Sequence, residues 1–478
     1  MAKCSFGKVS LKGCFHTYWP FGTDIYARLF YVNANDTEVL IAAMDTSDTF
    51  PKDTVRFREM VSKKSGIPAD NIWYHELQLH AAPNSVCLTG EYMERIADAV
   101  ATETLSMKNR AVEFTCEVAE AYAGMKYTVN REQYVAGLGG VTVWSGIDYD
   151  ENDKGYGNKW ERMLLRGYHP DLDALKKPVP FDNPVDPRAY LFVFRNEDLQ
   201  VIGTMTRFAA HPDVAVLFEL EGVSDQYHND YDWPGYLSDI MEKEFAAPSL
   251  YINGPCANLS THKHYEGRNT YEKSKAECIR IANDFADLLL TRYKTKTVPF
   301  GNENNCKSAH FEFYLPMRED FPHSAAEAKD FEAVIDAAEE ALQKAIRENA
   351  PAYVVKQLID DRWRVHMTHR YIDEVGGFTD EDLQRRSIKV EVKVLQLGDY
   401  LFIGVPGESL VELTEFLRSN FTGIKTVTVD QCGGYLGYMA TPTSLTLGGY
   451  TYWHSWVSRD AIPLLKDKIV EAMEDFLA

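Results

Sequence analysis

The stretch Gln200–Pro212, with the sequence QVIGTMTRFAAHP, decides the fold class of this chain. Its apolar and β-branched residues predict a strand over Gln200–Ala209 that runs directly into His211. Another apolar strand is expected just before it, at Ala189–Phe194. The elements expected after it alternate between helix and strand, at Pro234–Glu244, Ser249–Asn253 and Glu272–Tyr293. This alternation predicts a βαβ-type layer.

The N-terminal part of the chain predicts a hairpin followed by amphipathic helices. Tyr26–Val32 and Glu38–Met44 are rich in β-branched and aromatic residues, and Asn33–Asp36 supplies the turn. Apolar residues recur at helical spacing in Thr54–Lys64 and Glu91–Leu105. The C-terminal part predicts further strands and helices, at Ile388–Leu395, Tyr400–Val405, Ser409–Leu417, Thr426–Val429 and Ala461–Leu477. The chain is therefore expected to be an α/β (α+β) protein of mixed β-sheets layered with helices.

The length of the chain bears on its domain organisation. A single hydrophobic core stops growing near ~250–300 residues, whereas this chain has 478, which favours two layered lobes or one large domain. Because we find no internal repeat and no Pro/Ser-rich linker, one large domain over residues 1–478 is predicted. Ser324–Asn349 has helical periodicity and is interpreted as part of a helical arm over 309–375 that acts as a scaffold. Val143–Pro187, rich in Gly, Asp, Asn, Pro and Tyr, predicts a long ordered loop.

Composition and charge exclude several classes of protein. Hydrophobic residues make up 45% and charged residues 25% of the chain, which is typical of a folded globular protein. The formal net charge of -21 repels phosphate backbones and anionic lipid surfaces. We therefore expect neither nucleic acid nor a membrane as a partner. A small-molecule substrate is expected, and assembly into a homo-oligomer is left open.

The cysteines and the N-terminus indicate a compartment. Eight cysteines without a CxxC pair or regular spacing are not typical of a disulfide framework or a zinc ribbon. The first seven residues, MAKCSFG, contain no apolar signal core, and no later run approaches the ~20 apolar residues that span a bilayer. Reduced thiols and a cytoplasmic location are expected.

Four places combine the end of a strand with a polar or Gly-rich turn, where α/β enzymes present functional side chains. They are Gln78–Pro83, Phe208–Val214, Asn253–Thr261, and Gly404–Glu408 together with Cys432–Tyr438. Taken alone, His211 is more often a core or capping residue than a metal ligand. Glu408 more often complements the N-terminus of the helix that follows it. Local evidence therefore favours structural roles for both residues.

Nine short segments in a fixed order outweigh this local evidence for structural roles. They are Ile25–Arg28, Gly66–Pro68, His80–Pro83, Asn130–Arg131, Ala209–Pro212, Asp232–Tyr236, Asn253–Ser260, Gly404–Glu408 and Gly434–Tyr438. Their order resembles that of the neutral/alkaline (non-lysosomal) ceramidase family and covers nearly the whole chain. Each segment is a weak signal alone, but nine in this order are not expected by chance. The resemblance implies a ceramidase-like catalytic domain in a divergent member.

The resemblance also implies a metal site and a set of catalytic residues. Relatives hold a zinc ion with a histidine of a His-x-His motif, a His-Pro histidine, a Pro-Gly-Glu glutamate and a tyrosine of a Gly-Tyr-x-x-Tyr loop. The corresponding residues here are Gln78, His211, Glu408 and Tyr438. Residues that contact the substrate or its developing negative charge in relatives are matched by His80, Arg131 and Tyr450. A serine discussed as a nucleophile in some relatives is matched by Ser260.

The sequence departs from the family pattern at Gln78, where relatives have a zinc-binding histidine. An amide oxygen is a poorer zinc ligand than an imidazole nitrogen. Zinc should therefore bind less tightly, or another divalent metal should take its place. His80, His75 and Glu76 are the residues that could serve as a replacement ligand.

A second departure lies near Ser260. Relatives carry Gly-Asp where this chain has Asn258 and Leu259, and no histidine at a fixed offset identifies a base for the serine. A water nucleophile is therefore favoured. His262 and His264, just beyond, form a pair that resembles a metal motif, although two histidines in a polar loop are more often exposed to solvent.

These expectations combine into one function and its alternatives. Secreted relatives carry an additional C-terminal β-sandwich and a signal peptide; neither is expected here, and ceramide itself is not the expected substrate. The expected function is metal-dependent hydrolysis of an amide or related C–N bond in a small soluble molecule, with a metal-activated water as the nucleophile. One alternative is a metal-free pseudoenzyme or ligand-binding protein on the same fold. Another is a hydrolase of ester, lactone or sugar-linked substrates.

Overall fold

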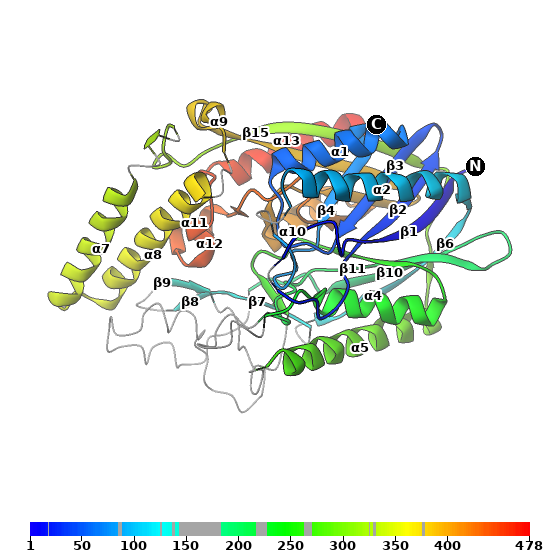
Figure 1. Cartoon of the computed structure of the whole chain (residues 1–478), viewed down its shortest axis with the longest axis horizontal. Coiled ribbons are helices and arrows are strands. Elements are labelled where there is room, and N and C mark those ends of the chain that lie inside the picture. Colours follow the sequence, from blue (N-terminus) through cyan, green and yellow to red (C-terminus); the bar gives the residue numbers. More distant parts are fainter. Residues whose placement is uncertain are drawn as a thin grey trace.

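The computed structural model confirms a fold of mixed β-sheets layered with helices (Figure 1). Within the described part of the chain, three larger sheets are accompanied by three two-stranded ladders. The structure describes residues 1–17, 19–84, 88–124, 127–135, 139–142, 183–216, 227–261, 270–324, 326–327, 331–374 and 378–478.

The first sheet has the strand order β4-β3-β2-β1-β5 and carries two helices across it (Figure 1). Its strands are β1 (Lys3–Ser10), β2 (Tyr26–Ala34), β3 (Thr37–Met44), β4 (Ile72–Glu76) and β5 (Val112–Glu113). The predicted hairpin is confirmed, with Ala34 paired to Thr37 across the turn. Both predicted helices are present, as α1 (Pro51–Ser65) and α2 (Glu91–Arg110).

The second sheet, in the order β12-β11-β10-β6-β14, contains the predicted βαβ layer. Its strands are β6 (Thr115–Tyr122), β10 (Arg188–Arg195), β11 (Val201–Phe208), β12 (Ser249–Asn253) and β14 (Val298–Pro299). β11 and β12 pair in parallel around α4 (Asp232–Phe245), and α5 (Tyr271–Thr295) packs beside α4. Because parallel strands end at the same edge, His211 and the loop after Asn253 start side by side.

The third sheet has the order β15-β16-β17-β19. Its strands are β15 (Cys306–Pro316), β16 (Ser387–Leu397), β17 (Tyr400–Gly404) and β19 (Lys425–Val429). β17 and β19 pair in parallel around α10 (Val411–Asn420), which brings the Glu408 turn and the residues after Val429 to one edge. The C-terminal helix α13 (Ala461–Leu477) packs on β15 and has the predicted bounds.

Short elements complete the fold and carry much of the candidate site. The ladders are β7 (Thr128–Asn130) with β13 (Leu259–Thr261), β8 (Glu132–Val135) with β9 (Gly139–Thr142), and β18 (Glu408–Ser409) with β20 (Tyr438–Met439). The short helices are η1 (Ala69–Asn71), η5 (Arg370–Glu374), α9 (Asp380–Arg385), α11 (Pro442–Leu447) and α12 (Tyr450–Trp453).

A helical arm is formed by α7 (Phe331–Arg347) and α8 (Ala352–His369), which lie against each other at one end of the molecule (Figure 1). The predicted extent of 309–375 is wrong at its start, because residues 309–316 belong to β15. That strand pairs with β16 along its whole length, a set of backbone hydrogen bonds that a helix there would lose. Of the predicted loop Val143–Pro187, only 183–187 lies within the described residues, and the single domain stays a prediction.

Two clusters of buried apolar side chains form the main core. The larger joins the first two sheets to their helices and contains Trp73 and Trp233, both fully buried. The second lies between the third sheet and α13 and contains Trp456. Leu79 belongs to the first cluster and Met439 to the second, so the segments that carry the predicted site residues meet between the two cores.

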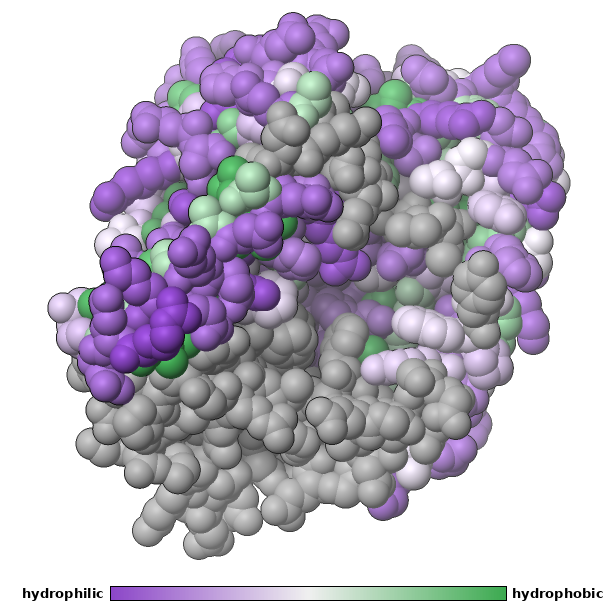
Figure 2. All heavy atoms as spheres, turned by 60° about the vertical axis from the view of Figure 1, so that its left-hand side comes forward, coloured by the Kyte–Doolittle hydropathy of each residue, from purple (hydrophilic) through white to green (hydrophobic). Residues whose placement is uncertain are grey.

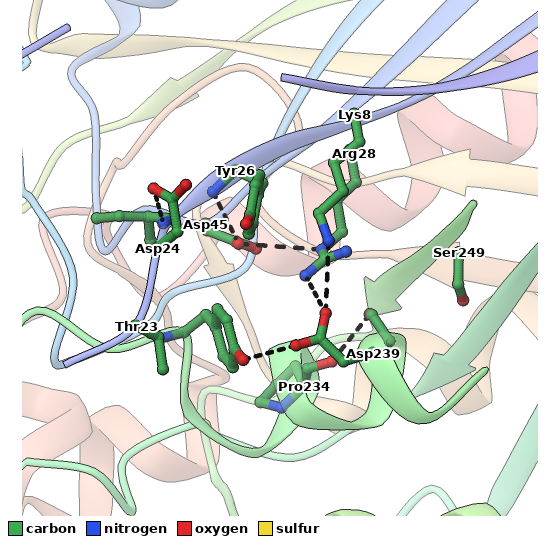
Figure 3. Close-up of polar contacts among 12 residues, drawn as sticks. Lys8, Thr23, Asp24, Tyr26, Arg28, Asp45, Pro234, Asp239 and Ser249 are labelled. Atoms are coloured by element: carbon green, nitrogen blue, oxygen red, sulfur yellow. Dashed lines mark hydrogen bonds and ion pairs between the residues drawn. The ribbon is translucent and has the colours of Figure 1, made fainter. Parts of the chain in front are cut away.

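An ion network centred on the buried Arg28 joins the first sheet to α4, and Figure 3 shows its contacts with Asp45 and Asp239. Arg28 on β2 is only 1% exposed. Its Nη1 lies 2.8 Å from Glu242, its Nη2 lies 3.5 Å from Asp239, and its Nε lies 3.9 Å from Asp45. Tyr231 donates a hydrogen bond of 2.6 Å to Asp239. Each charge therefore has a nearby opposite charge, and the network fixes α4 against the sheet.

The described part of the surface shown in Figure 2 is predominantly hydrophilic. The described hydrophobic side chains on this face lie in small separate groups. None of the helices in the described ranges is long and apolar enough to cross a membrane.

Candidate functional site

His211 lies just beyond β11 and is completely buried. Its backbone N–H donates to the carbonyl oxygen of Leu259 at 3.1 Å, and Thr261 Oγ1 donates to the His211 carbonyl oxygen at 2.6 Å. Its Nδ1 lies 2.8 Å from the carbonyl oxygen of Cys256. Because a carbonyl oxygen can only accept, Nδ1 carries the hydrogen and the lone pair of Nε2 points into the site.

Glu408 approaches that lone pair from the third sheet. Pairing of β18 with β20 makes Glu408 and Tyr438 register partners, and Gly407 adopts a φ of 53° in the turn before them. Oε2 of Glu408 lies 3.6 Å from Nε2 of His211, and it has no hydrogen-bond partner among the described residues. Two buried acceptors at this distance repel each other unless a proton or a cation lies between them.

Arg131 supplies positive charge to the site. It follows β7, whose pairing with β13 sets it against the segment 257–260. Its Nη2 donates to Oη of Tyr438 at 2.5 Å and lies 3.4 Å from Nε2 of His211. Both Nε and Nη2 also donate to the carbonyl oxygen of Ala257. The residue is only 1% exposed, so its charge acts in a medium of low dielectric constant.

Gln78 and His80 lie on the segment that follows β4. Gln78 has a φ of 58°, uncommon for a residue other than glycine, and the turn it makes lets His80 N–H donate to the carbonyl oxygen of Pro212 at 3.2 Å. The rings of His80 and His211 meet edge to face with centroids 5.1 Å apart. The side chain of Gln78 lies close enough to that of Glu408 to lower the pKa of the carboxyl group. Gln78 therefore lies beside Glu408, and its role as a ligand stays a prediction.

Aromatic side chains from the C-terminal part border the site. Tyr450 begins α12, and its ring centroid lies 5.5 Å from that of Tyr438 and 4.1 Å from that of His454. Burial lowers the pKa of His454 to about 3, and the charges of Arg370 and Arg131 act in the same direction. This imidazole is therefore neutral at physiological pH.

The carboxyl group of Glu408 has a pKa close to physiological pH. Burial raises its pKa to about 7. Hydrogen bonds from Gln78 and Tyr438 and the charge of Arg131 lower this pKa, but they do not offset burial. Near pH 7 the group is divided between its protonated and ionised forms, and a bound cation would favour the ionised form.

Asp430 is a buried residue of the site that sequence reasoning missed. Its Oδ1 accepts from the backbone N–H of Ser409 at 3.1 Å, and its Oδ2 accepts from that of Cys256 at 3.4 Å. One carboxylate thus ties the turn that carries Glu408 to the loop whose carbonyl oxygen orients His211. The available signal was a polar residue directly after a predicted strand, but the expected site segment began two residues later.

Among the possible replacements for the missing histidine ligand, His75 is excluded. Its Nδ1 lies 2.7 Å from the carbonyl oxygen of Asp430, and its Nε2 accepts from the backbone N–H of Asn253 at 3.1 Å. Both ring nitrogens are therefore engaged. Glu76 is buried, and neither of its carboxylate oxygens has a hydrogen bond of good geometry within the described ranges.

The structure describes the predicted nucleophile, Ser260, but not the second histidine motif. Ser260 is buried on β13 and forms a β-bridge with His211, so it lies beside the site. Its role as a nucleophile stays a prediction. His262 and His264 lie outside the described residues.

A second group of potential metal ligands lies on the third sheet. His310, Glu312 and Glu391 each place one ligand atom within 4.8 Å of the others. Arg58 lies 2.7 Å from Glu391, and Lys389 lies 2.6 Å from Glu312. Glu312 is 45% exposed, whereas His211 and Glu408 are both buried. Because water weakens the attraction between a metal ion and an exposed carboxylate, the group on the third sheet is the weaker candidate.

Comparison with known proteins identifies the fold. No model of a protein family matches the chain, and no curated protein matches it by sequence. The chain is similar over 98% of its length to 73% of neutral ceramidase from Pseudomonas aeruginosa, with a TM-score of 0.62 and 11% sequence identity. It is similar over 98% of its length to 74% of a ceramidase complexed with C2, with a TM-score of 0.61 and 11% identity. The chain therefore has a ceramidase-like fold.

Proposed function

We propose that this protein is a divalent-metal-dependent hydrolase that cleaves an amide or related C–N bond of a small soluble substrate. The ceramidase-like fold supports an amide hydrolase. The observation that carries the proposal is the pair of buried acceptors, Nε2 of His211 and Oε2 of Glu408, which lie 3.6 Å apart. A shared cation resolves the repulsion between two such atoms.

The residues present fit a divalent ion. Zinc is the expected metal, and His211, Glu408, Tyr438 and Gln78 would hold it with one nitrogen and three oxygen donors. This oxygen-rich set also suits manganese or iron. When bound, such an ion supplies Lewis acidity that polarises a carbonyl group and makes water more acidic. The backbone contacts of Asp430 keep the two principal donors in place.

Three other residues are assigned to the negative charge that develops on the substrate carbonyl oxygen. Arg131 is oriented in advance by Tyr438 and Ala257, so it need not reorganise during the reaction. One such preorganised donor is typically worth about 10²–10³ in rate. His80 and Tyr450 border the same site and are assigned the same role. Water is the proposed nucleophile, and Ser260 is the alternative.

A metal-free ligand-binding protein is the second candidate, and Gln78 is the observation that favours it. A neutral amide replaces an imidazole ligand at this position. Arg131 also lies 3.4 Å from Nε2 of His211 and can hold that atom without an ion. A hydrolase of ester, lactone or sugar-linked substrates would use the same residues.

The test uses the full chain purified without chelator. Metal content is measured, and hydrolysis of N-acyl amino acids is compared with that of the matching esters, before and after chelation and after addition of zinc, manganese or iron. We expect bound metal, amide hydrolysis that chelation abolishes, and recovery when the ion is returned. His211→Ala and Glu408→Gln should lose both the metal and the activity, whereas His310→Ala, at the second group of ligands, should keep both.

Two results would overturn the proposal. Protein that contains no metal and gains no activity with any of the three ions would favour the metal-free binding protein. Hydrolysis of the esters without hydrolysis of the amides would assign the site to the alternative substrate class.

A further inference from the structure

A separate cavity of about 470 Å³ lies at the root of the helical arm. It is formed where α8 meets α11, α12 and the β8–β9 ladder, at the end of the molecule shown on the left of Figure 1. Its volume falls within the ~300–1,000 Å³ of small-molecule sites. Its wall includes one tyrosine from each of three elements, Tyr134 on β8, Tyr353 on α8 and Tyr452 on α12.

Two of these tyrosines are largely exposed. Tyr134 is 59% exposed and Tyr353 is 56% exposed. Tyrosine buries a large flat face on contact and loses little conformational entropy, because its side chain has few rotatable bonds. Two exposed rings from distant parts of the chain at one cavity are therefore better suited to contact a ligand than to support the core.

The charged groups of the cavity wall are matched within the protein. Nζ of Lys356 lies 2.7 Å from Asp360. Asp361 accepts a hydrogen bond of 3.0 Å from Oη of Tyr452 and lies 3.4 Å from Arg364. Each of these carboxylates thus has a cationic partner, and the cavity has little excess charge with which to attract an ion. Its polar groups can still exchange hydrogen bonds with a ligand.

We propose that this cavity binds a neutral, hydroxyl-rich group such as a pyranose ring. One face of a pyranose consists of C–H groups, which pack against an aromatic ring, and its rim carries hydroxyl groups. The carboxylate of Asp361 and the amide of Gln357 line the cavity and offer partners for those hydroxyls, whereas Asp360 is buried and bonded to Lys356 and Trp453. This binding site is distinct from the candidate hydrolytic site and does not depend on the proposed reaction.

The position of the cavity connects it to the candidate active site. Tyr450 and Tyr452 are two positions apart in α12, so their side chains point to nearly opposite sides of the helix. Tyr450 packs against Tyr438, whereas Tyr452 lines the cavity. Asp360 on the cavity wall also accepts a hydrogen bond of 3.3 Å from the N–H of Gly449, directly before Tyr450. A bound ligand would lie one short helix away from a candidate catalytic residue.

The proposal is tested by calorimetric titration of the full chain. The probes are methyl β-glucopyranoside, methyl α-mannopyranoside, N-acetylglucosamine and lactose, with n-butylammonium chloride as a cationic probe. We expect at least one sugar to bind saturably in the millimolar range or more tightly, and Tyr134→Ala combined with Tyr353→Ala to weaken that binding at least about tenfold. Tyr314→Ala is the matched control, because Tyr314 is also 49% exposed but lies on β15.

Fluorescence gives a second readout that does not depend on binding heat. Nε1 of Trp453 donates to Asp360 at 2.8 Å, so a ligand at this wall should change tryptophan emission, and Trp453→Phe should remove the change. Thermal unfolding of each variant checks that the fold is retained. Absence of binding by every sugar, or equal weakening by Tyr314→Ala, would overturn the proposal. Tighter, tyrosine-dependent binding of n-butylammonium would assign the cavity to amines instead.

Discussion

Arg28 and Arg131 are both buried arginines, each 1% exposed, but their surroundings differ. Around Arg28, three carboxylates lie within ion-pair distance, from 2.8 Å to 3.9 Å. Glu242 and Asp239 lie on α4, and Asp45 directly follows β3; Figure 3 shows the contacts with Asp239 and Asp45. This guanidinium pairs with these carboxylates and so holds α4 against the first sheet. The region around Arg28 is therefore structural.

Around Arg131 the hydrogen bonds include neutral partners, the hydroxyl of Tyr438 and the ring of His211. Oε2 of Glu408 lies in the same site without a hydrogen bond among the described residues. The guanidinium of Arg28 thus faces carboxylates directly, whereas that of Arg131 donates to Tyr438 and Ala257, with Asp213 and Glu408 as nearby acidic groups. Burial alone therefore does not distinguish a structural arginine from a candidate catalytic one; the groups that the guanidinium contacts do.

The largest expected effect is on stability, at Arg28. Arg28→Met leaves Asp45 buried without its cation, and removing one partner of a buried pair typically costs about 3–5 kcal/mol. We expect urea unfolding to show a loss of that size, with unchanged metal content in the folded protein. Lys8→Met is the control, because Lys8 pairs with the same acidic helix but is 23% exposed and should cost about 1 kcal/mol or less. Equal losses in the two variants would show that the buried Arg28 does not stabilise the fold more than the partly exposed Lys8.

The next effect should fall on catalysis, at Arg131. Arg131→Met removes a preorganised donor and should lower kcat/KM by about 10²–10³ on a substrate identified by the amide screen. Arg131→Lys keeps the charge but not the planar fork, so it should give a smaller loss. The rates are compared at equal concentrations of folded protein. If Arg131→Met destabilised the protein as much as Arg28→Met is expected to, with no change in the rate of the folded fraction, the contrast between the two regions would be lost.

The region around Arg28 should also differ from that around Arg131 in how it makes the stability of the protein depend on pH. Burial raises the pKa of Asp45 from its ordinary value of 3.8 to about 6, against the opposing charge of Arg28. Between those values the folded state binds more protons than the unfolded state, so this group's contribution to stability is complete below pH 4 and is lost as the pH rises through about 6. The change is at most about 3 kcal/mol.

Asp45→Asn should remove that dependence. Urea unfolding of the wild type and the variant from pH 4 to pH 7 checks it, and the wild-type stability should fall relative to the variant as the pH rises. A difference between them that stays constant across this range would show that Asp45 does not titrate in the folded protein as described.

The smallest expected effect is on zinc affinity, at Gln78. Gln78→His restores the ligand that the family resemblance implies, and histidine is one of the residues that tolerate a positive φ. We expect zinc affinity to rise at least about tenfold, which corresponds to about 1.4 kcal/mol, in a competition titration against a chromogenic chelator. An unchanged affinity would mean that this position does not reach the ion.

The sequence predicted the elements whose signals are local. The hairpin over 26–44 and the helix Ala461–Leu477 follow from strand composition and helical periodicity, and both are present. The start of the predicted arm was wrong because β15 is held by pairing with β16, far along the chain. Such pairing leaves no local periodicity to distinguish an edge strand from the beginning of a helical segment.

The candidate site was only partly predictable. Local evidence favoured structural roles for His211 and Glu408, and the family resemblance alone suggested that they converge. Asp430 was not predicted because it contributes hydrogen bonds between two loops, and the spacing of residues in the sequence does not reveal such contacts. The Arg28 network escaped for the same reason, since its partners come from strands and a helix that only the fold brings together.

The most direct measurement is an anomalous difference map from crystals of the full chain grown with zinc and collected at the zinc absorption edge. We predict a peak about 2.0–2.2 Å from Nε2 of His211 and from a carboxylate oxygen of Glu408. No peak at that position, or a peak only beside His310 on the third sheet, would contradict it.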